Sequence, residues 1–210
     1  MKSALPMQIR PAQTSDIDQM VLVHIEAFPD FFLTLMGPRF LRLLYRGFVC
    51  HPTGISLVAC VQGRPSEVLG FVVGTTQPQG FFAQLLRQRW MAFGFASLWP
   101  LLRRPGLVFA KLWSALFYRG ESLPDQPSAA LLSSLGVKPS QQGQRIGQQL
   151  VSAFLDHAQT AGAPAVYLTT DQSDNIKANQ FYTKLGFELA GTCKRPHGRI
   201  LNRYLIKLSA

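Results

Sequence analysis

The chain has 210 residues, of which 47% are hydrophobic and 15% charged, and its 21 Lys and Arg against 11 Asp and Glu give a formal net charge of +10. This apolar-rich composition excludes a disordered chain, and the length suffices for one domain with a sizeable core. The basic balance favours an acidic partner, such as a phosphorylated cofactor, a nucleic acid or an anionic membrane.

The first eighty residues predict a strand, two helices and a hairpin. Residues 7–10 alternate as a strand does, and an amphipathic helix follows them. His24 lies on the apolar face of that helix, which predicts a core or groove-edge histidine satisfied by one hydrogen bond. A second helix begins at Pro38, and strands over residues 55–61 and 68–75 form the hairpin.

A basic, aromatic-rich segment follows, which we expect to be a helical insertion at about residues 78–124. Residues 81–118 contain ten aromatic residues, including all three tryptophans, and residues 81–120 contain six basic and no acidic residues. Two or three short helices are predicted, with breaks at Pro100 and at residues 105–106. Three roles stay open for this segment: a lid over a substrate, peripheral contact with a membrane, or packing on the sheet or on a second subunit in an oligomer.

The remaining chain predicts two strand–helix units and a final hairpin. Each helix follows its strand after a short polar turn, and the last two strands are joined by a turn at residues 195–198. The predicted strands are 131–137, 165–170, 187–193 and 200–208, and the predicted helices are 146–160 and 176–185. This order predicts a mixed α/β sheet of about seven strands in a single domain over residues 1–210.

The cysteines and the N-terminus indicate a cytoplasmic protein. Cys50, Cys60 and Cys193 are odd in number and far apart, without a metal-binding spacing, so we expect buried, reduced thiols and no metal. The first six residues lack the apolar segment of a signal peptide. The longest apolar run, residues 91–102, is too short to span a bilayer.

The turn before the helix at Ile146 has the features of a phosphate-binding loop. Backbone N–H groups at the start of a helix, next to the positive end of its dipole, bind phosphate. A Walker loop is excluded because Gly147 is followed by Gln148 and Gln149 in place of Lys-Ser/Thr. A dinucleotide-binding turn is excluded because only Gly143 and Gly147 are present, one glycine short of its pattern.

Two motifs resemble those of the GNAT superfamily of N-acetyltransferases. The stretch Gln142-Gly143-Gln144-Arg145-Ile146-Gly147 resembles the acetyl-CoA loop Gln/Arg-x-x-Gly-x-Gly/Ala, with Arg145 in place of the first glycine. This replacement is tolerated if Arg145 keeps helical dihedrals. Residues 175–187 resemble the family signature Asn-x-x-Ala-x-x-Phe-Tyr-x-x-x-Gly-Phe. The front of the chain also resembles the start of this fold, whereas residues 81–120 match no core element.

The resemblance implies a GNAT-like mixed, mostly antiparallel seven-stranded sheet with flanking helices, and acetyl-CoA as co-substrate. The strands at 131–137 and 165–170 are expected to splay apart, so that pantetheine pairs with an open strand edge. The implied cofactor-binding residues are Leu135, Gly136, Val137, Gln142, Gly143, Gln144, Arg145, Ile146, Gly147, Gln148, Asn175, Ala178, Phe181 and Tyr182.

The resemblance also implies the chemistry. Tyr182 stands at the family position of the general acid, and a phenol with a pKa of about 10 roughly matches an alkyl thiol. A backbone N–H near residues 135–137 would stabilise the developing oxyanion. The general base stays open among five side chains, a water chain and a substrate amine that is already partly neutral. Asn202 and Tyr204 face either the acceptor or solvent. The five side chains are Glu26, Asp30, His24, Asp171 and His197.

The predicted function is transfer of an acetyl group from acetyl-CoA to a primary amine by direct attack. The acceptor stays open between a small-molecule or sugar-linked amine and a protein amine. Nucleic-acid binding rests on charge alone and is not expected. The alternative is a non-catalytic acyl-CoA-binding or membrane-associated module on the same fold.

Overall fold

The computed structural model describes residues 7–103, 128–173, 175–194 and 200–208. The strands are β1 Met7–Pro11, β2 Gly54–Val61, β3 Arg64–Thr75, β4 Ala130–Val137, β5 Ala165–Asp171, β6 Glu188–Lys194 and β7 Ile200–Lys207. The α-helices are α1 Ile17–Ala27, α2 Phe32–Leu35, α3 Pro38–Cys50, α4 Pro78–Arg103, α6 Ile146–Thr160 and α7 Ile176–Lys184. Two 3₁₀ turns, Thr14–Asp16 and Pro139–Gln141, precede α1 and α6.

The seven strands form one sheet in the order β1-β2-β3-β4-β5-β7-β6. Every neighbouring pair is antiparallel except β4 and β5, which run parallel. The parallel pair follows from the chain order, because α6 returns the chain to the same end of the sheet between these two strands. The predicted mixed, mostly antiparallel seven-stranded sheet with flanking helices is confirmed.

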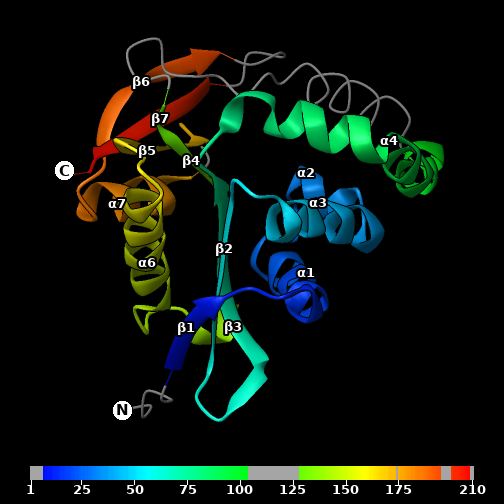
Figure 1. Cartoon of the computed structure of the whole chain (residues 1–210), viewed down its shortest axis with the longest axis horizontal. Helices are drawn as coiled ribbons and strands as arrows, with labels where there is room; N and C mark the ends of the chain where they lie inside the picture. The colour runs from blue at the N-terminus through cyan, green and yellow to red at the C-terminus, as the bar shows by residue number, and fades with distance from the viewer. Residues whose placement is uncertain (1–6, 104–127, 174, 195–199, 209–210) are drawn as a thin grey trace.

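The sheet separates two layers of helices (Figure 1). Helices α6 and α7 cover one face, where Leu150 and Phe154 of α6 are fully buried against β2, β3 and β5. Helices α1, α3 and α4 cover the other face, where Tyr45 and Phe71 pack edge to face, with ring centroids 5.0 Å apart. Helices α1, α3 and α6 thus bury the apolar faces that the sequence predicts. Strand β4, one of the parallel pair, is the central strand of the sheet.

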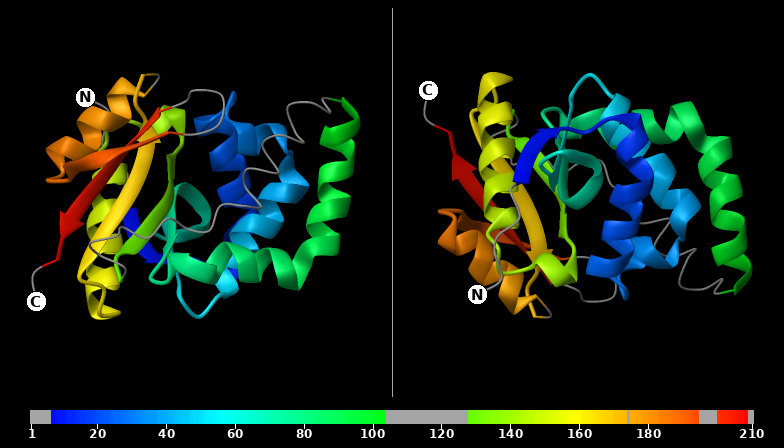
Figure 2. Two further views of the ribbon diagram at one scale, coloured as in Figure 1. Left: turned by 90° about the horizontal axis from the view of Figure 1, so that it is seen from above. Right: turned by 90° about the horizontal axis from the view of Figure 1, so that it is seen from below.

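Helix α4 differs from the prediction. The predicted break at Pro100 is wrong, because a single helix runs from Pro78 to Arg103, and Figure 2 shows that it bends along its length. Proline in a helix removes one backbone hydrogen bond and clashes with the preceding turn. Packing of α4 on α3, with Phe40 and Phe93 centroids 5.1 Å apart, offsets this cost. The rest of the predicted insertion and the predicted turn at 195–198 lie outside the described residues.

The cysteines only partly match the prediction. Cys60 is buried in β2 and Cys193 is half-buried, but Cys50 is exposed at the end of α3, so the expectation of three buried thiols is wrong. No helix in the described ranges is long and apolar enough to cross a membrane.

Candidate functional site

Strands β4 and β5 separate soon after they start. They pair only through Ala130 with Val166 and Leu131 with Tyr167, whereas β4 stays paired with β3 as far as Val137. The predicted splaying of these two strands is confirmed. Beyond Leu131, the edge of β4 that faces β5 is open to pair with an extended ligand, as an added strand would.

A bulge and a glycine shape the open part of β4. Val73 pairs with Ser134 and Gly74 with Leu132, so Ser133 is the extra residue of a β-bulge. Gly136 is buried, and a Cβ at this position would lie 2.7 Å from Cε1 of Phe71. The missing side chain therefore lets β4 lie close against Phe71 on the α1 side of the sheet.

The loop from β4 to α6 presents free backbone donors. Gly143 has a φ of +84°, and Gln144 Nε2 donates to Gln141 Oε1 at 2.9 Å, which fixes the side chains of the turn. Within the described part of the chain, the N–H groups of residues 143–148 donate to no backbone carbonyl. No side chain caps α6, which at fifteen residues is long enough to carry a full helix dipole. These donors suit the pyrophosphate of CoA.

Arg145 does not keep right-handed helical dihedrals, so the condition stated for tolerating it in place of the family's glycine is not met. Its φ of 62° and ψ of 12° place it in the left-handed region as the N-cap of α6. A non-glycine residue in this conformation costs about 1–2 kcal/mol. The family's glycine at this position would adopt it freely, so Arg145 introduces strain together with an exposed guanidinium at the loop.

Helix α7 packs against the start of α6. A Cβ on Gly147 would lie 3.4 Å from Cζ of Phe181, an ordinary contact that alanine would also fit. Ala178 and Phe181 are half-buried against the core, whereas Asn175 is the exposed N-cap of α7. The structure thus brings the loop and the signature helix together through Gly147 and Phe181.

Tyr182 is buried behind Phe181. Its ring packs edge to face on Phe181 at 5.1 Å and on Phe187 at 5.6 Å. Burial raises the pKa of Tyr182 above the ordinary value that the sequence suggests, so the phenol stays protonated at neutral pH. A protonated phenol is the state that a general acid requires.

On the other face, the structure forms a buried polar contact that the sequence does not reveal. His24 Nδ1 and the hydroxyl of Tyr45 are 2.5 Å apart, which confirms the expected single hydrogen bond. His24 and Tyr45 lie on different helices and are 21 residues apart in the sequence. Their places on the apolar faces of these helices were the only signal in the sequence for their pairing.

The other predicted acceptor-side residues are more scattered. Glu26 and Asp30 are exposed, Asp171 is half-buried at the end of β5, and His197 lies outside the described residues. Asn202 and Tyr204, for which two orientations were open, are both buried rather than solvent-facing. Asn202 Nδ2 lies 3.5 Å from Asn179 Oδ1, and Thr170 donates to the same oxygen at 2.5 Å, so this cluster ties β5 and β7 to α7.

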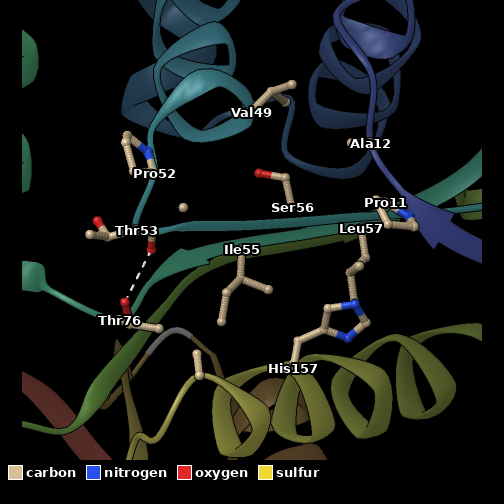
Figure 3. A pocket seen from close by; sticks show the side chains of 12 residues that line it. Pro11, Ala12, Val49, Pro52, Thr53, Ile55, Ser56, Leu57, Thr76 and His157 are labelled. Carbon is tan, nitrogen blue, oxygen red and sulfur yellow. Dashed lines mark hydrogen bonds between the residues drawn. The ribbon is translucent and has the colours of Figure 1, made fainter.

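A separate cavity of about 300 Å³ lies at the edge of β2 (Figure 3). Thr53, Ser56 and His157 are among its lining residues, and Thr76 Oγ1 donates to the Thr53 carbonyl at 3.4 Å. His157 is in the last turn of α6, whereas the predicted loop is at the first turn. The cavity is therefore distinct from the predicted site. Among the described residues, no group of three His, Cys, Asp or Glu side chains could hold a metal ion.

Comparison with known proteins identifies the family. The model of the Acetyltransferase (GNAT) family matches residues 18–187. Mycothiol acetyltransferase of Thermobifida fusca is 29% identical over 150 residues, which are 71% of this chain and 39% of the relative. Mycothiol acetyltransferase of Sanguibacter keddieii is 41% identical over 95 residues, which are 45% of this chain and 29% of the relative. The matched part is thus less than half the length of these relatives.

Solved structures share the fold at low sequence identity. Ard1 from Thermoplasma volcanium has a TM-score of 0.61 and 14% identity, over 98% of this chain and 100% of that one. The ribosomal-protein-S18-alanine N-acetyltransferase from Escherichia coli has a TM-score of 0.57 and 15% identity, over 97% of this chain and 95% of that one. The fold, the matched range and the loop agree, and the chain belongs to the acetyltransferase (GNAT) family, whose members use acetyl-CoA as co-substrate.

Proposed function

We propose that this protein transfers an acetyl group from acetyl-CoA to the primary amine of a small-molecule acceptor. The observation that carries the proposal is the separation of β4 from β5 directly before a loop of unpartnered backbone donors. The two features suit the two ends of CoA, because an open strand edge binds amides and a helix N-terminus binds phosphates.

Acetyl-CoA would bind along β4 and the loop. The pantetheine arm would pair with the edge of β4 at Leu135, Gly136 and Val137, and the pyrophosphate would accept from the N–H groups of residues 143–148. Gln142 and Phe181 would border the cofactor on either side of the loop. Asn175 and Ala178 would line it from α7. The family motif supports these roles.

The reaction would be a direct attack. The acceptor nitrogen forms a bond to the thioester carbonyl carbon, and the carbon–sulfur bond breaks. A backbone N–H of β4 near Gly136 stabilises the charge on the carbonyl oxygen. Tyr182 donates its proton to the leaving thiolate and is reprotonated by the proton that the amine loses, carried by water. Tyr182 is protonated at neutral pH, as a phenol with a pKa of about 10 also is. Burial raises its pKa above that value, which makes it a weaker acid than the match to an alkyl thiol assumes.

The relatives support a small-molecule acceptor. The two named mycothiol acetyltransferases favour a small molecule over a protein amine. A panel of glucosamine, an alkyl glucosaminide, an alanine-initiated peptide and spermidine tests the proposal, with release of free CoA as the readout. Saturable release with a sugar amine is expected. If no amine releases CoA above the background rate, the non-catalytic acyl-CoA-binding alternative replaces the enzyme.

Replacing Arg145 separates its charge from its strain. Arg145→Gly removes both, and we expect acetyl-CoA to bind about fivefold more weakly at low salt, or about 1 kcal/mol, with no loss of thermal stability. Arg145→Lys keeps the charge and the left-handed strain, and its affinity should stay close to that of the wild type. Calorimetric titration at low and high salt measures this, because salt screens an exposed charge. Equal affinity of the wild type and Arg145→Gly at low salt would contradict a phosphate contact.

Peripheral membrane contact is a second proposed activity, supported by a groove of about 460 Å³ between α3 and α4. Arg39, Arg42 and Arg46 line it at helical spacing, and all three are exposed. Phe95, which is 74% exposed, lines the opposite wall. Asp18 is the acidic residue of the lining, and it pairs with Arg42 at 2.5 Å. Arginine beside an exposed aromatic ring suits an anionic bilayer surface.

Vesicle co-sedimentation tests this contact. We expect binding to phosphatidylcholine vesicles that contain phosphatidylserine, and none to phosphatidylcholine alone. The double variant Arg39→Gln/Arg46→Gln should bind these vesicles more weakly, with a loss of about 1 kcal/mol of binding free energy for each arginine removed. Arg64→Gln is the matched control, because Arg64 is also exposed but lies on β3 beside Glu67. An equal loss in the control, or no binding at low salt, would remove the membrane proposal.

A further inference from the structure

His24 has one ring nitrogen without a hydrogen-bond partner. The side chain is fully buried on α1, and its Nδ1 pairs with Tyr45. Its Nε2 is also buried, and no described residue hydrogen-bonds to it. A buried polar atom without a partner is costly and rare in native proteins, so this nitrogen needs an explanation.

The surroundings of His24 connect it to the open part of β4. Its ring lies 5.2 Å from that of Phe28 and 6.3 Å from that of Phe31. A Cβ on Gly136 would lie 3.5 Å from Cε2 of Phe28, so Phe28 touches β4 where the acetyl group is proposed to lie. Phe31 is 42% exposed. His24 therefore lies one side chain behind the acceptor side of the site.

Nδ1 of His24 is taken up by the bond to Tyr45, so Nε2 is the ring nitrogen left to meet a ligand. Burial raises the pKa of Tyr45, so its hydroxyl stays protonated. When Nδ1–H donates to the Tyr45 oxygen, the neutral ring leaves Nε2 as an acceptor. Burial lowers the pKa of His24 to about 4, which keeps the ring uncharged at neutral pH.

We infer that His24 Nε2 accepts a hydrogen bond from the amine acceptor, either from its amino group or from a neighbouring hydroxyl. This inference rests on the proposed acetyltransferase function. The acceptor reaches Nε2 by displacing Phe31, the more exposed of the two covering rings. The contact orients the amine toward the carbonyl carbon beside Gly136 and involves no proton transfer to the ring.

A pair of amide variants tests the contact. The amide of Asn can replace Nδ1 and that of Gln can replace Nε2, so His24→Asn keeps the bond to Tyr45 and His24→Gln keeps the acceptor position. With glucosamine and the alanine-initiated peptide as probes, we expect His24→Asn to raise the amine KM about tenfold on the better probe (about 1.4 kcal/mol). The kcat and the acetyl-CoA KM should stay unchanged. His24→Gln should recover most of the amine KM.

The opposite order would overturn the inference. If His24→Asn keeps the wild-type amine KM while His24→Gln loses it, His24 serves only to hold Tyr45. Nitrogen-15 NMR of the full chain is a readout that needs neither variant. An unprotonated Nε2 whose resonance shifts when glucosamine is added supports the contact. A protonated Nε2, or a resonance that does not change, rejects it. If the wild type acetylates an amine but the amine KM values of the two variants follow the opposite order, this inference alone is contradicted. If the wild type acetylates no amine of the panel, the proposed function is contradicted as well.

Discussion

Tyr182→Phe is expected to lower kcat by about 10²–10⁴-fold while acetyl-CoA binds as before. The ring of Tyr182 is packed between Phe181 and Phe187, and phenylalanine preserves both edge-to-face contacts. Only the hydroxyl, which burial keeps protonated, is lost. Release of free CoA gives kcat, and calorimetric titration gives the acetyl-CoA affinity.

Tyr167→Phe is the matched control. Tyr167 is a buried tyrosine on β5, in a different hydrophobic cluster, and it belongs neither to the family motif nor to the predicted acceptor side. Its variant should retain wild-type turnover. Equal losses of kcat in the two variants would show that removing either buried hydroxyl lowers kcat by disturbing the core. An unchanged kcat in Tyr182→Phe would remove the general-acid role.

Gly74→Ala is expected to lower the free energy of unfolding by about 3 kcal/mol, the upper end of the range for overpacking. A Cβ on Gly74 would lie 2.0 Å from the carbonyl oxygen of Leu131 and 2.5 Å from Cζ of Phe154. The backbone cannot yield locally, because Leu131 is where β4 pairs with β5 before the two strands part. The variant should therefore also weaken acetyl-CoA binding, and urea unfolding measures the change in stability.

Gly94→Ala provides the control for this substitution. Gly94 lies within α4, and a Cβ there meets no atom within 4 Å. Alanine in a helix interior is favoured over glycine by roughly 0.5–1 kcal/mol. The control should be as stable as the wild type or slightly more so, and a similar loss in both variants would contradict the packing argument at Gly74.

Much of the fold could be predicted because its elements are locally periodic. The apolar run at 131–137 is β4, and the apolar stripe beginning at Ile146 is the buried face of α6. The two motifs also predict the separation of β4 from β5, which depends on topology that the family shares. The resemblance assigns Gly147 and Phe181 to the same cofactor site, and the structure brings them together.

The errors arise where tertiary packing overrides local preference. Pro100 does not end α4, which is held against α3 by Phe93 and Leu85. Arg145 adopts a left-handed conformation because the loop must turn sharply into α6, whatever residue stands there. The contact of His24 with Tyr45 could not be predicted, because it joins α1 to α3 across the folded chain.

A crystal structure of the full chain with acetyl-CoA tests the central claim most directly. We predict that the pantetheine arm pairs with β4 at Leu135–Val137, that the pyrophosphate accepts from the backbone of residues 143–148, and that the Tyr182 hydroxyl lies within hydrogen-bond reach of the thioester sulfur. CoA bound elsewhere, for example in the cavity beside His157, or a Tyr182 hydroxyl turned away from the sulfur, would contradict the account.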